Sequence, residues 1–142
     1  MDPFVGTGSI SIEASLVGAN VVGVDLSEQM ARGAISNMRH FAQNWVGVIR
    51  ADSAHLPVRR ADAVATDIPY GRASSTRGRE PSVILDLLLP TLAAVMAKDS
   101  HAALMHPHEV PVPRSAEFSI EEEHHLHVHK LLTRTITILR RR

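Results

Sequence analysis

The stretch DPFVGTGSISIEA, residues 2–14, places a glycine-containing turn directly before an apolar run. Gly6 and Gly8 let backbone amides approach a ligand closely, and a helix predicted over residues 9–17 would direct the positive end of its dipole to the same place. A single G-x-G is a weak signal by itself. The strand predicted at Val21–Asp25, however, ends in a carboxylate nineteen positions after Gly6, close to the ~20 typical of an acid that binds a ribose diol. Together the turn and the acid predict a nucleoside site.

Two positions near this turn bear on which nucleoside would bind. The dinucleotide fingerprint G-x-G-x-x-G would require a third glycine where the chain has Ser11. Asp2 lies four residues before Gly6 and would repel a diphosphate. A carboxylate there suits a cationic group, such as the amino group or sulfonium of S-adenosylmethionine. An NAD-dependent oxidoreductase remains an alternative that these two residues disfavour.

Apolar strands and helical segments alternate along the chain, which is typical of an α/β domain with a mostly parallel sheet and helices on both faces. Beyond Val21–Asp25, strands are predicted over residues 45–49, 61–66 and 101–105, a helix over residues 81–98, and a hairpin or two adjacent strands over residues 118–139. A further helix should begin after Ser27 as N-cap. Met30, Ala34, Met38 and Phe41 would then form its buried face.

Three aspartates follow the predicted parallel strands. In such sheets ligands bind beyond the carboxyl ends of the strands, and Asp25, Asp52 and Asp67 would all lie at that edge. Any one of them alone would be interpreted as a helix N-cap or a loop acid. Three acids at one edge, beside a glycine turn, predict a binding site.

Composition narrows the function classes. The chain has 142 residues, of which 44% are apolar, and its formal net charge is zero. One domain with a sizeable core is expected, and nucleic acid could be contacted only through local patches. There is no cysteine, which excludes disulfides and thiolate chemistry and fits the cytoplasm. The most apolar segment, residues 81–97, is broken by Asp86 and Pro90, so no membrane span is expected.

A second stretch, VATDIPYGRASS at residues 64–75, ends an apolar strand on a carboxylate and continues with proline, tyrosine and glycine. Proline at position 69 restricts the preceding residue to extended conformations and so helps to aim its carbonyl group. Considered alone, DIPY is equally well explained as an ordinary turn. Arg72, Arg77 and Arg79 follow and either contact phosphates or keep a loop solvated.

Four segments, DPFVGTGSISIEA, GVDLSEQM, ADSAHLP and TDIPYG, resemble in order and spacing the Rossmann-like S-adenosylmethionine methyltransferases that modify exocyclic amines. The greatest similarity is to the tRNA guanine-N2 methyltransferases that carry a THUMP domain. The ending HVHKLLTRTITILRR resembles their last two strands, which implies an antiparallel C-terminal strand. The resemblance implies S-adenosylmethionine as cofactor and guanine N2 in tRNA as target. Two alternatives remain. The methyl group could be transferred to adenine N6 or to a protein glutamine, or the chain could be a non-catalytic module that binds S-adenosylmethionine or a partner.

The resemblance also implies roles for particular residues. Asp2 and the Gly6–Gly8 loop would hold the methionine part of the cofactor, Asp25 the ribose hydroxyls, and Asp52 the adenine amino group. The full cofactor set is Asp2, Pro3, Phe4, Gly6, Thr7, Gly8, Asp25, Leu26, Asp52 and Ser53. The target-amine set is Asp67, Ile68, Pro69 and Tyr70. No metal is expected, because His125, His127 and His129 are better interpreted as a solvated strand face.

The chain departs from this family in two respects. Ile68 occupies a position where the family usually has proline; its carbonyl is retained, but its N–H and freer φ predict a less rigid turn. The strand that normally precedes Asp2 is absent, and it would lie between the strands that end in Asp25 and Asp67. We therefore expect an upstream segment or a partner chain, such as a second copy in a homodimer, to complete the sheet. We also expect this chain alone to bind RNA weakly.

Overall fold

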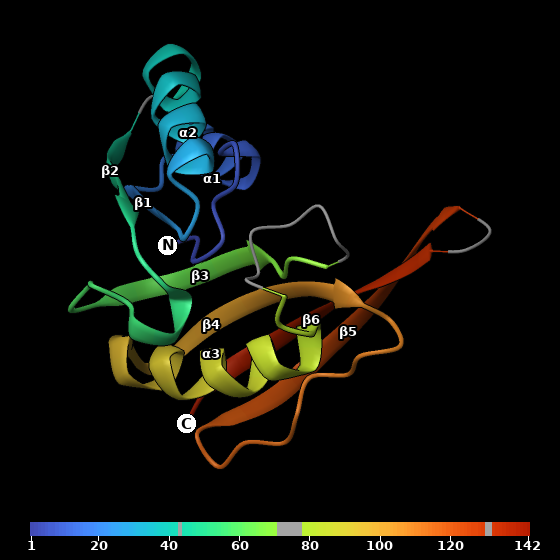
Figure 1. Ribbon diagram of the computed structural model, residues 1–142. Helices are drawn as coiled ribbons and strands as arrows, with labels where there is room; N and C mark the ends of the chain where they lie inside the picture. The colour runs from blue at the N-terminus through green and yellow to red at the C-terminus, as the bar shows by residue number, and fades with distance from the viewer. Residues whose placement is uncertain (43, 71–77, 130–131) are drawn as a thin grey trace.

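The computed structural model describes residues 1–42, 44–70, 78–129 and 132–142. Figure 1 shows the arrangement of its helices and strands. In chain order the elements are α1 (Ser9–Leu16), β1 (Val21–Asp25), α2 (Glu28–Phe41), β2 (Trp45–Arg50), the 3-10 turn η1 (Ser53–His55), β3 (Ala61–Asp67), α3 (Pro81–Val95), β4 (Met96–Pro107), β5 (Phe118–His129) and β6 (Leu132–Arg141).

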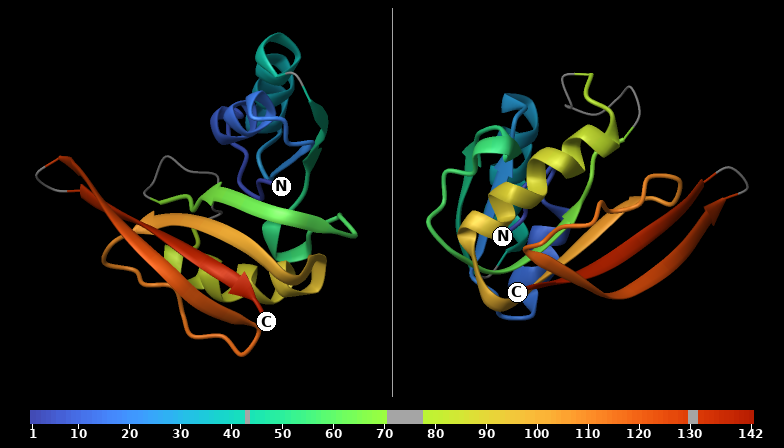
Figure 2. Two further views of the ribbon diagram at one scale, coloured as in Figure 1. Left: turned by 180° about the vertical axis from the view of Figure 1, so that it is seen from behind. Right: turned by 90° about the horizontal axis from the view of Figure 1, so that it is seen from below.

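The strands of the described residues form two sheets. β1 pairs with β2 in parallel, while the second sheet has the order β3-β4-β6-β5. Within it β3 and β4 are parallel, and β6 is antiparallel to both β4 and β5, which confirms the predicted C-terminal hairpin. Figure 2 shows this hairpin reaching away from the rest of the molecule.

Met1 and Asp2 connect the two sheets. The Asp2 N–H donates to the Val22 carbonyl at 2.9 Å, and the Val24 N–H donates to the Asp2 carbonyl at 2.8 Å. On the other side, the Ala65 N–H donates to the Met1 carbonyl at 3.1 Å. These bonds lie between β1 and β3, where the family resemblance implies a further strand.

Helix α2 begins as predicted, with the Ser27 hydroxyl accepting from the Met30 N–H at 3.4 Å and Glu28 in the first turn. Ala34 and Met38 are buried, but Phe41 is 56% exposed, so its prediction as a core residue is wrong. Phe41 is the last residue of the helix, where little remains to pack against it.

Helix α3 ends at Val95 rather than at Lys98, so the predicted boundary is wrong by three residues. Met96 already pairs with Ala61 of β3, and this pairing takes the backbone out of the helix. Pro90 lies inside α3.

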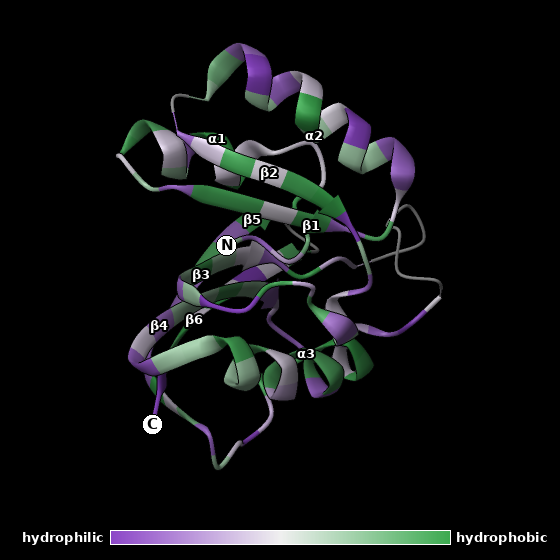
Figure 3. Ribbon diagram, turned by 90° about the vertical axis from the view of Figure 1, so that its left-hand side faces the viewer, coloured by the Kyte–Doolittle hydropathy of each residue, from purple (hydrophilic) through white to green (hydrophobic). Residues whose placement is uncertain are grey.

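The main core lies between α3 and the second sheet. Leu85, Leu88 and Leu92 of α3 are fully buried, as are Leu104 of β4 and Ile68 just after β3. Each such side chain contributes roughly 1.5–3 kcal/mol by leaving water. Figure 3 shows apolar residues (green) distributed through α3, β1 and β2. In the described part of the chain, no helix has the length and apolar character needed to span a membrane.

Candidate active site

The turn between residues 2 and 8 is built against the carboxyl end of β1. The Val5 N–H donates to the Val24 carbonyl at 2.8 Å, and the Gly8 N–H closes the turn on the Val5 carbonyl at 2.7 Å. Gly8 caps α1 with a φ of 96°, a left-handed conformation that favours glycine. Gly23 of β1 lets the turn come close, because a Cβ atom there would lie 2.7 Å from Val5 Cγ2.

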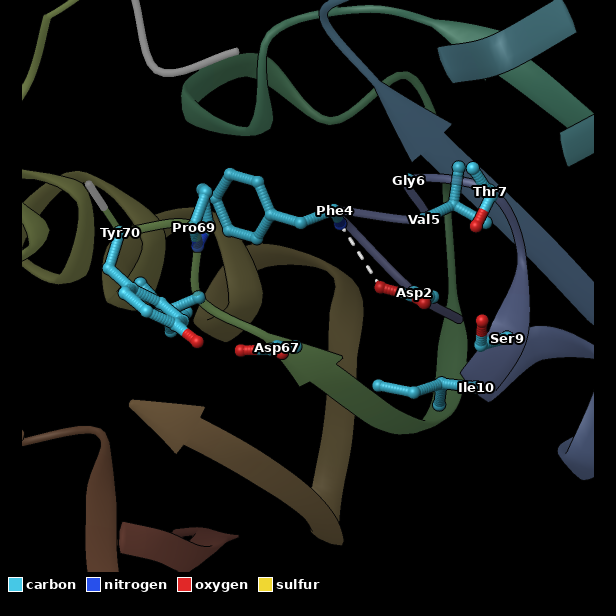
Figure 4. A pocket seen from close by; sticks show the side chains of 11 residues that line it. Asp2, Phe4, Val5, Gly6, Thr7, Ser9, Ile10, Asp67, Pro69 and Tyr70 are labelled. Atoms are coloured by element: carbon cyan, nitrogen blue, oxygen red, sulfur yellow. Dashed lines mark hydrogen bonds between the residues drawn. The ribbon is translucent and has the colours of Figure 1, made fainter. Parts of the chain in front are cut away.

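This turn and the residues after β3 line one cavity of about 310 Å³, at the lower end of the ~300–1,000 Å³ usual for ligand pockets. Its lining residues are Asp2, Phe4, Val5, Gly6, Thr7, Ser9, Ile10, Asp67, Ile68, Pro69 and Tyr70. Figure 4 shows the Phe4 ring beside Pro69, with the Asp67 carboxylate toward the side of Tyr70. The structure thus brings together the first glycine turn and all of the predicted target-amine residues.

Asp2 is the buried acid of this cavity, with 2% of its surface exposed. Its Oδ1 accepts from the Thr66 hydroxyl at 2.6 Å and from the Phe4 N–H at 3.1 Å. Burial raises the pKa of Asp2 to about 6, although these hydrogen bonds and the nearby N-terminal ammonium act in the opposite direction. Near pH 7 the pocket therefore carries a desolvated carboxylate, which suits a cationic group.

Asp25 ends β1 at the predicted edge but is not among the residues that line this cavity. It is 4% exposed. One carboxylate oxygen accepts from the Gly6 N–H at 3.0 Å and the other from the Ser27 N–H at 2.8 Å. Asp25 therefore ties the glycine turn to the start of α2. Gly8, which packs beside Ala34, also lies outside the cavity lining.

Asp52 lies in a separate recess of about 20 Å³, which has room for little more than a water molecule. The recess is lined by Pro3, Phe4, Leu26, Asp52, Ser53, Arg79 and Ile84. Arg79 donates to both oxygens of Asp52, at 3.0 and 2.9 Å, and Asp52 also caps η1 by accepting from the Ala54 N–H at 3.0 Å. Phe4 lines both cavities, so eight of the ten predicted cofactor residues, all but Gly8 and Asp25, line two adjacent cavities.

The turn after β3 is anchored more firmly than its sequence suggests. The Ile68 N–H donates to the Met105 carbonyl of β4 at 2.8 Å, and the Ile68 side chain is fully buried in the core. The N–H that proline would lack thus adds a hydrogen bond to β4, while the lower rigidity expected of this turn stays a prediction.

Two arginines complete the site in ways that the sequence did not predict. Arg134 of β6 donates from both terminal nitrogens to the two oxygens of Asp67, in one case at 2.7 Å, and its guanidinium lies 4.5 Å from the centre of the Tyr70 ring. Arg79 pairs with Asp52, a contact that the sequence did not predict. One feature of the sequence could have indicated this ion pair. Arg134 lies in the alternating strand 132–141, where a cation should be buried only if it is paired. Arg72 and Arg77 lie outside the described residues.

The histidines of β5 make local contacts. His125 Nδ1 lies 3.1 Å from the Thr135 hydroxyl, and its ring meets that of His108 edge to face at 4.8 Å between centroids. Across residues 1–42, 44–70, 78–129 and 132–142, no three side chains of histidine or acid are grouped closely enough to hold a metal ion.

The family model described as "RMKL-like, methyltransferase domain" matches residues 1–136. The chain belongs to this family. A tRNA (guanine(10)-N2)-dimethyltransferase from Methanothermobacter thermautotrophicus is 34% identical over 144 residues, an alignment that covers 99% of this chain and 43% of that protein.

Solved structures show the same Rossmann-like methyltransferase fold. TrmN from Thermus thermophilus superposes with a TM-score of 0.82 at 21% identity, covering 99% of this domain and 43% of that chain. Magnesium protoporphyrin IX methyltransferase from Synechocystis PCC 6803, determined with bound SAM, gives a TM-score of 0.70 at 21% identity over 98% of this domain and 68% of that chain. The domain thus spans less than half the length of the tRNA dimethyltransferase and of TrmN.

Proposed function

We propose that this chain is the catalytic part of an S-adenosylmethionine-dependent methyltransferase that acts on an exocyclic amine of a nucleic acid base, guanine N2 in tRNA. The observation that supports this most strongly is the shared cavity, in which Asp2 and the Phe4–Thr7 turn face Asp67, Ile68, Pro69 and Tyr70. The named function of the 34% identical tRNA dimethyltransferase points to the same substrate.

The donor set of the site fits the proposed cofactor. Bound S-adenosylmethionine supplies an electrophilic methyl group on a positively charged sulfur. Asp2, a desolvated carboxylate, would hold the cationic methionine part, and the Gly6–Gly8 turn would enclose it. Asp25 would accept from the ribose hydroxyls, and Asp52 with Ser53 and Leu26 would receive the adenine. The adenine subsite requires Arg79 to leave Asp52, because only about 20 Å³ is open there.

The other half of the cavity has the groups that an exocyclic amine requires. Such an amine is a poor nucleophile, since its lone pair is delocalised into the ring. Asp67 would accept one N–H and the carbonyl of Ile68 the other, which orients the nitrogen and stabilises the positive charge that develops on it during transfer. Tyr70, which is 37% exposed, would stack on the base, a contact worth ~1–3 kcal/mol. A base within a duplex would first have to be flipped out.

The test is methyl transfer from labelled S-adenosylmethionine to tRNA, DNA or protein acceptors, with Asp67 replaced. Asp67→Asn removes the charge but keeps the shape and is expected to lower kcat at least about a hundredfold, the effect usual for the loss of one preorganised electrostatic contact. The dissociation constant for S-adenosylmethionine should change by less than about threefold, because Asp67 is assigned to the target amine and not to the cofactor.

Asp62→Asn is the matched control, because it replaces an aspartate of the same strand that is paired with the exposed Arg60. It should leave kcat unchanged. Label that appears only in DNA or protein would reassign the substrate to adenine N6 or glutamine. An Asp67→Asn variant as active as the wild type would contradict the proposed mechanism, and an inactive wild type that binds the cofactor would favour a non-catalytic module.

A further inference from the structure

Arg134 lies outside the cavity but contacts two of the residues that line it. It is on β6, at the far side of β4 from the strand that ends in Asp67. In the register of the sheet Asp67 lies beside Met105, and Met105 beside Ile136. Arg134 is two residues from Ile136 and so shares its face of the sheet. Its side chain can therefore reach across β4 to the carboxylate.

The contact is specific in geometry. Both terminal nitrogens of Arg134 donate to Asp67, one to each carboxylate oxygen. This end-on, two-point arrangement fixes the plane of the carboxylate as well as its position. The same guanidinium lies 4.5 Å from the centroid of Tyr70, within cation–π range. One cation therefore contacts both the carboxylate and the aromatic residue at this end of the cavity.

Stability alone gives little reason for this contact. The Arg134 side chain is 9% exposed, whereas that of Asp67 is 39% exposed. Among the described residues, the buried Nε of Arg134 has no hydrogen-bond partner. A cation that loses its water in this way stabilises a fold little more than an apolar side chain would. Its more open partner, Asp67, keeps one further acceptor site on each oxygen for a ligand N–H.

We propose that Arg134 is a positioning residue, which holds the Asp67 carboxylate and the Tyr70 ring in the arrangement that receives the target amine. The inference rests on the function proposed above. It makes the C-terminal hairpin part of the active site, although no residue of β5 or β6 lines the cavity.

The test compares Arg134→Lys and Arg134→Gln with Arg140→Gln in the complete chain. Arg140 is a suitable control because it is on the same strand and pairs with Asp99, in an exposed ion pair. Lysine keeps the charge but supplies neither the planar fork nor two-point bonding. Both Arg134 variants should lower kcat for methyl transfer to tRNA by at least about tenfold. The dissociation constant for S-adenosylmethionine should remain within about twofold of the wild type, because the affected residues lie at the target end of the cavity.

A second measurement reports the geometry independently of activity. Tyr70 is the only tyrosine in the chain, so selective ¹³C labelling of the ring gives a single set of NMR signals. These signals should shift in both Arg134 variants and remain unchanged in Arg140→Gln. Circular dichroism identifies any variant that has lost its fold. If Arg134→Gln is unfolded, the role of Arg134 is judged from Arg134→Lys, which keeps the positive charge and most of the aliphatic side chain.

The outcomes separate the two proposals. If the wild type transfers methyl groups but either folded Arg134 variant keeps more than half of its kcat, or if the Tyr70 signals do not move, the role assigned to Arg134 is wrong and the proposed function stands. If the wild type modifies no acceptor at all, both are wrong.

Discussion

At the scale of single residues, the site depends on acids whose partners are supplied by distant parts of the chain. Asp2 bonds to Thr66, Asp52 to Arg79, and Asp67 to Arg134. Each acid was predicted from its position before a glycine turn or after a strand. None of their partners was predicted, because each partner comes from another element and meets its acid only in the folded chain.

Asp2 should make the stability of the protein depend on pH. Its folded-state pKa of about 6 exceeds the 3.8 that is usual for an aspartate, so the stability that it contributes is fully present below pH ~4 and is lost as the pH rises through ~6. The loss corresponds to about 3 kcal/mol at 1.36 kcal/mol per pKa unit. Urea unfolding followed by Trp45 fluorescence at pH 4 to 7 should show this decline in the wild type and not in Asp2→Asn. Parallel pH profiles for the two proteins would show that the pKa of Asp2 is not raised.

Arg79 should compete with the adenine amino group for Asp52. The two side chains are 31% and 19% exposed, and an ion pair near the surface is worth ~0.2–1 kcal/mol. Arg79→Ala should therefore tighten binding of S-adenosylmethionine by up to about fivefold in calorimetry. Arg60→Ala, which breaks the exposed pair with Asp62, is the control and should have no effect. Weaker binding by Arg79→Ala would mean instead that the guanidinium contributes to holding the nucleoside.

At the scale of elements, the site lies where the glycine turn packed on β1 meets the residues that follow β3. Gly23 in β1 admits the side chain of Val5, which sets the glycine turn close to the strand. Ile68 extends the pairing of β3 with β4 by one hydrogen bond and places the following Pro69 and Tyr70 at the cavity.

Gly23→Ala should destabilise the fold by about 1–3 kcal/mol, the usual cost of inserting a methyl group into a packed site. The new Cβ would lie 2.7 Å from Val5 Cγ2 and 2.9 Å from Val5 Cβ. Gly47→Ala, in the paired strand β2 with nothing within 4 Å of the added Cβ, is the control and should not destabilise. Chemical denaturation followed by circular dichroism measures both. Replacing Val5 by alanine as well should recover part of the loss; equal stability of the two single variants would contradict the close approach.

At the scale of the whole molecule, backbone hydrogen bonds of Met1 and Asp2 connect the two sheets, and Asp2 also lines the cavity. In the C-terminal hairpin, β6 pairs with β4 on the side away from β3 and supplies Arg134. Three expectations remain predictions: that this chain alone binds RNA weakly, that it is located in the cytoplasm, and that an upstream segment or a partner completes the sheet.

The sequence by itself determined the order of the strands and helices, the glycine turn and the acids that end β1 and β3, because periodicity, turn residues and spacing along the chain are local properties. It failed at the end of α3, where pairing of Met96 with Ala61 takes precedence over the helical pattern, and at Phe41, which is exposed as the last residue of α2. Only the tertiary structure decided that Asp52 and Asp67 are held by Arg79 and Arg134. Ion pairs between residues 27 and 67 positions apart leave no periodic signal, since they depend on how strands are ordered across the sheet.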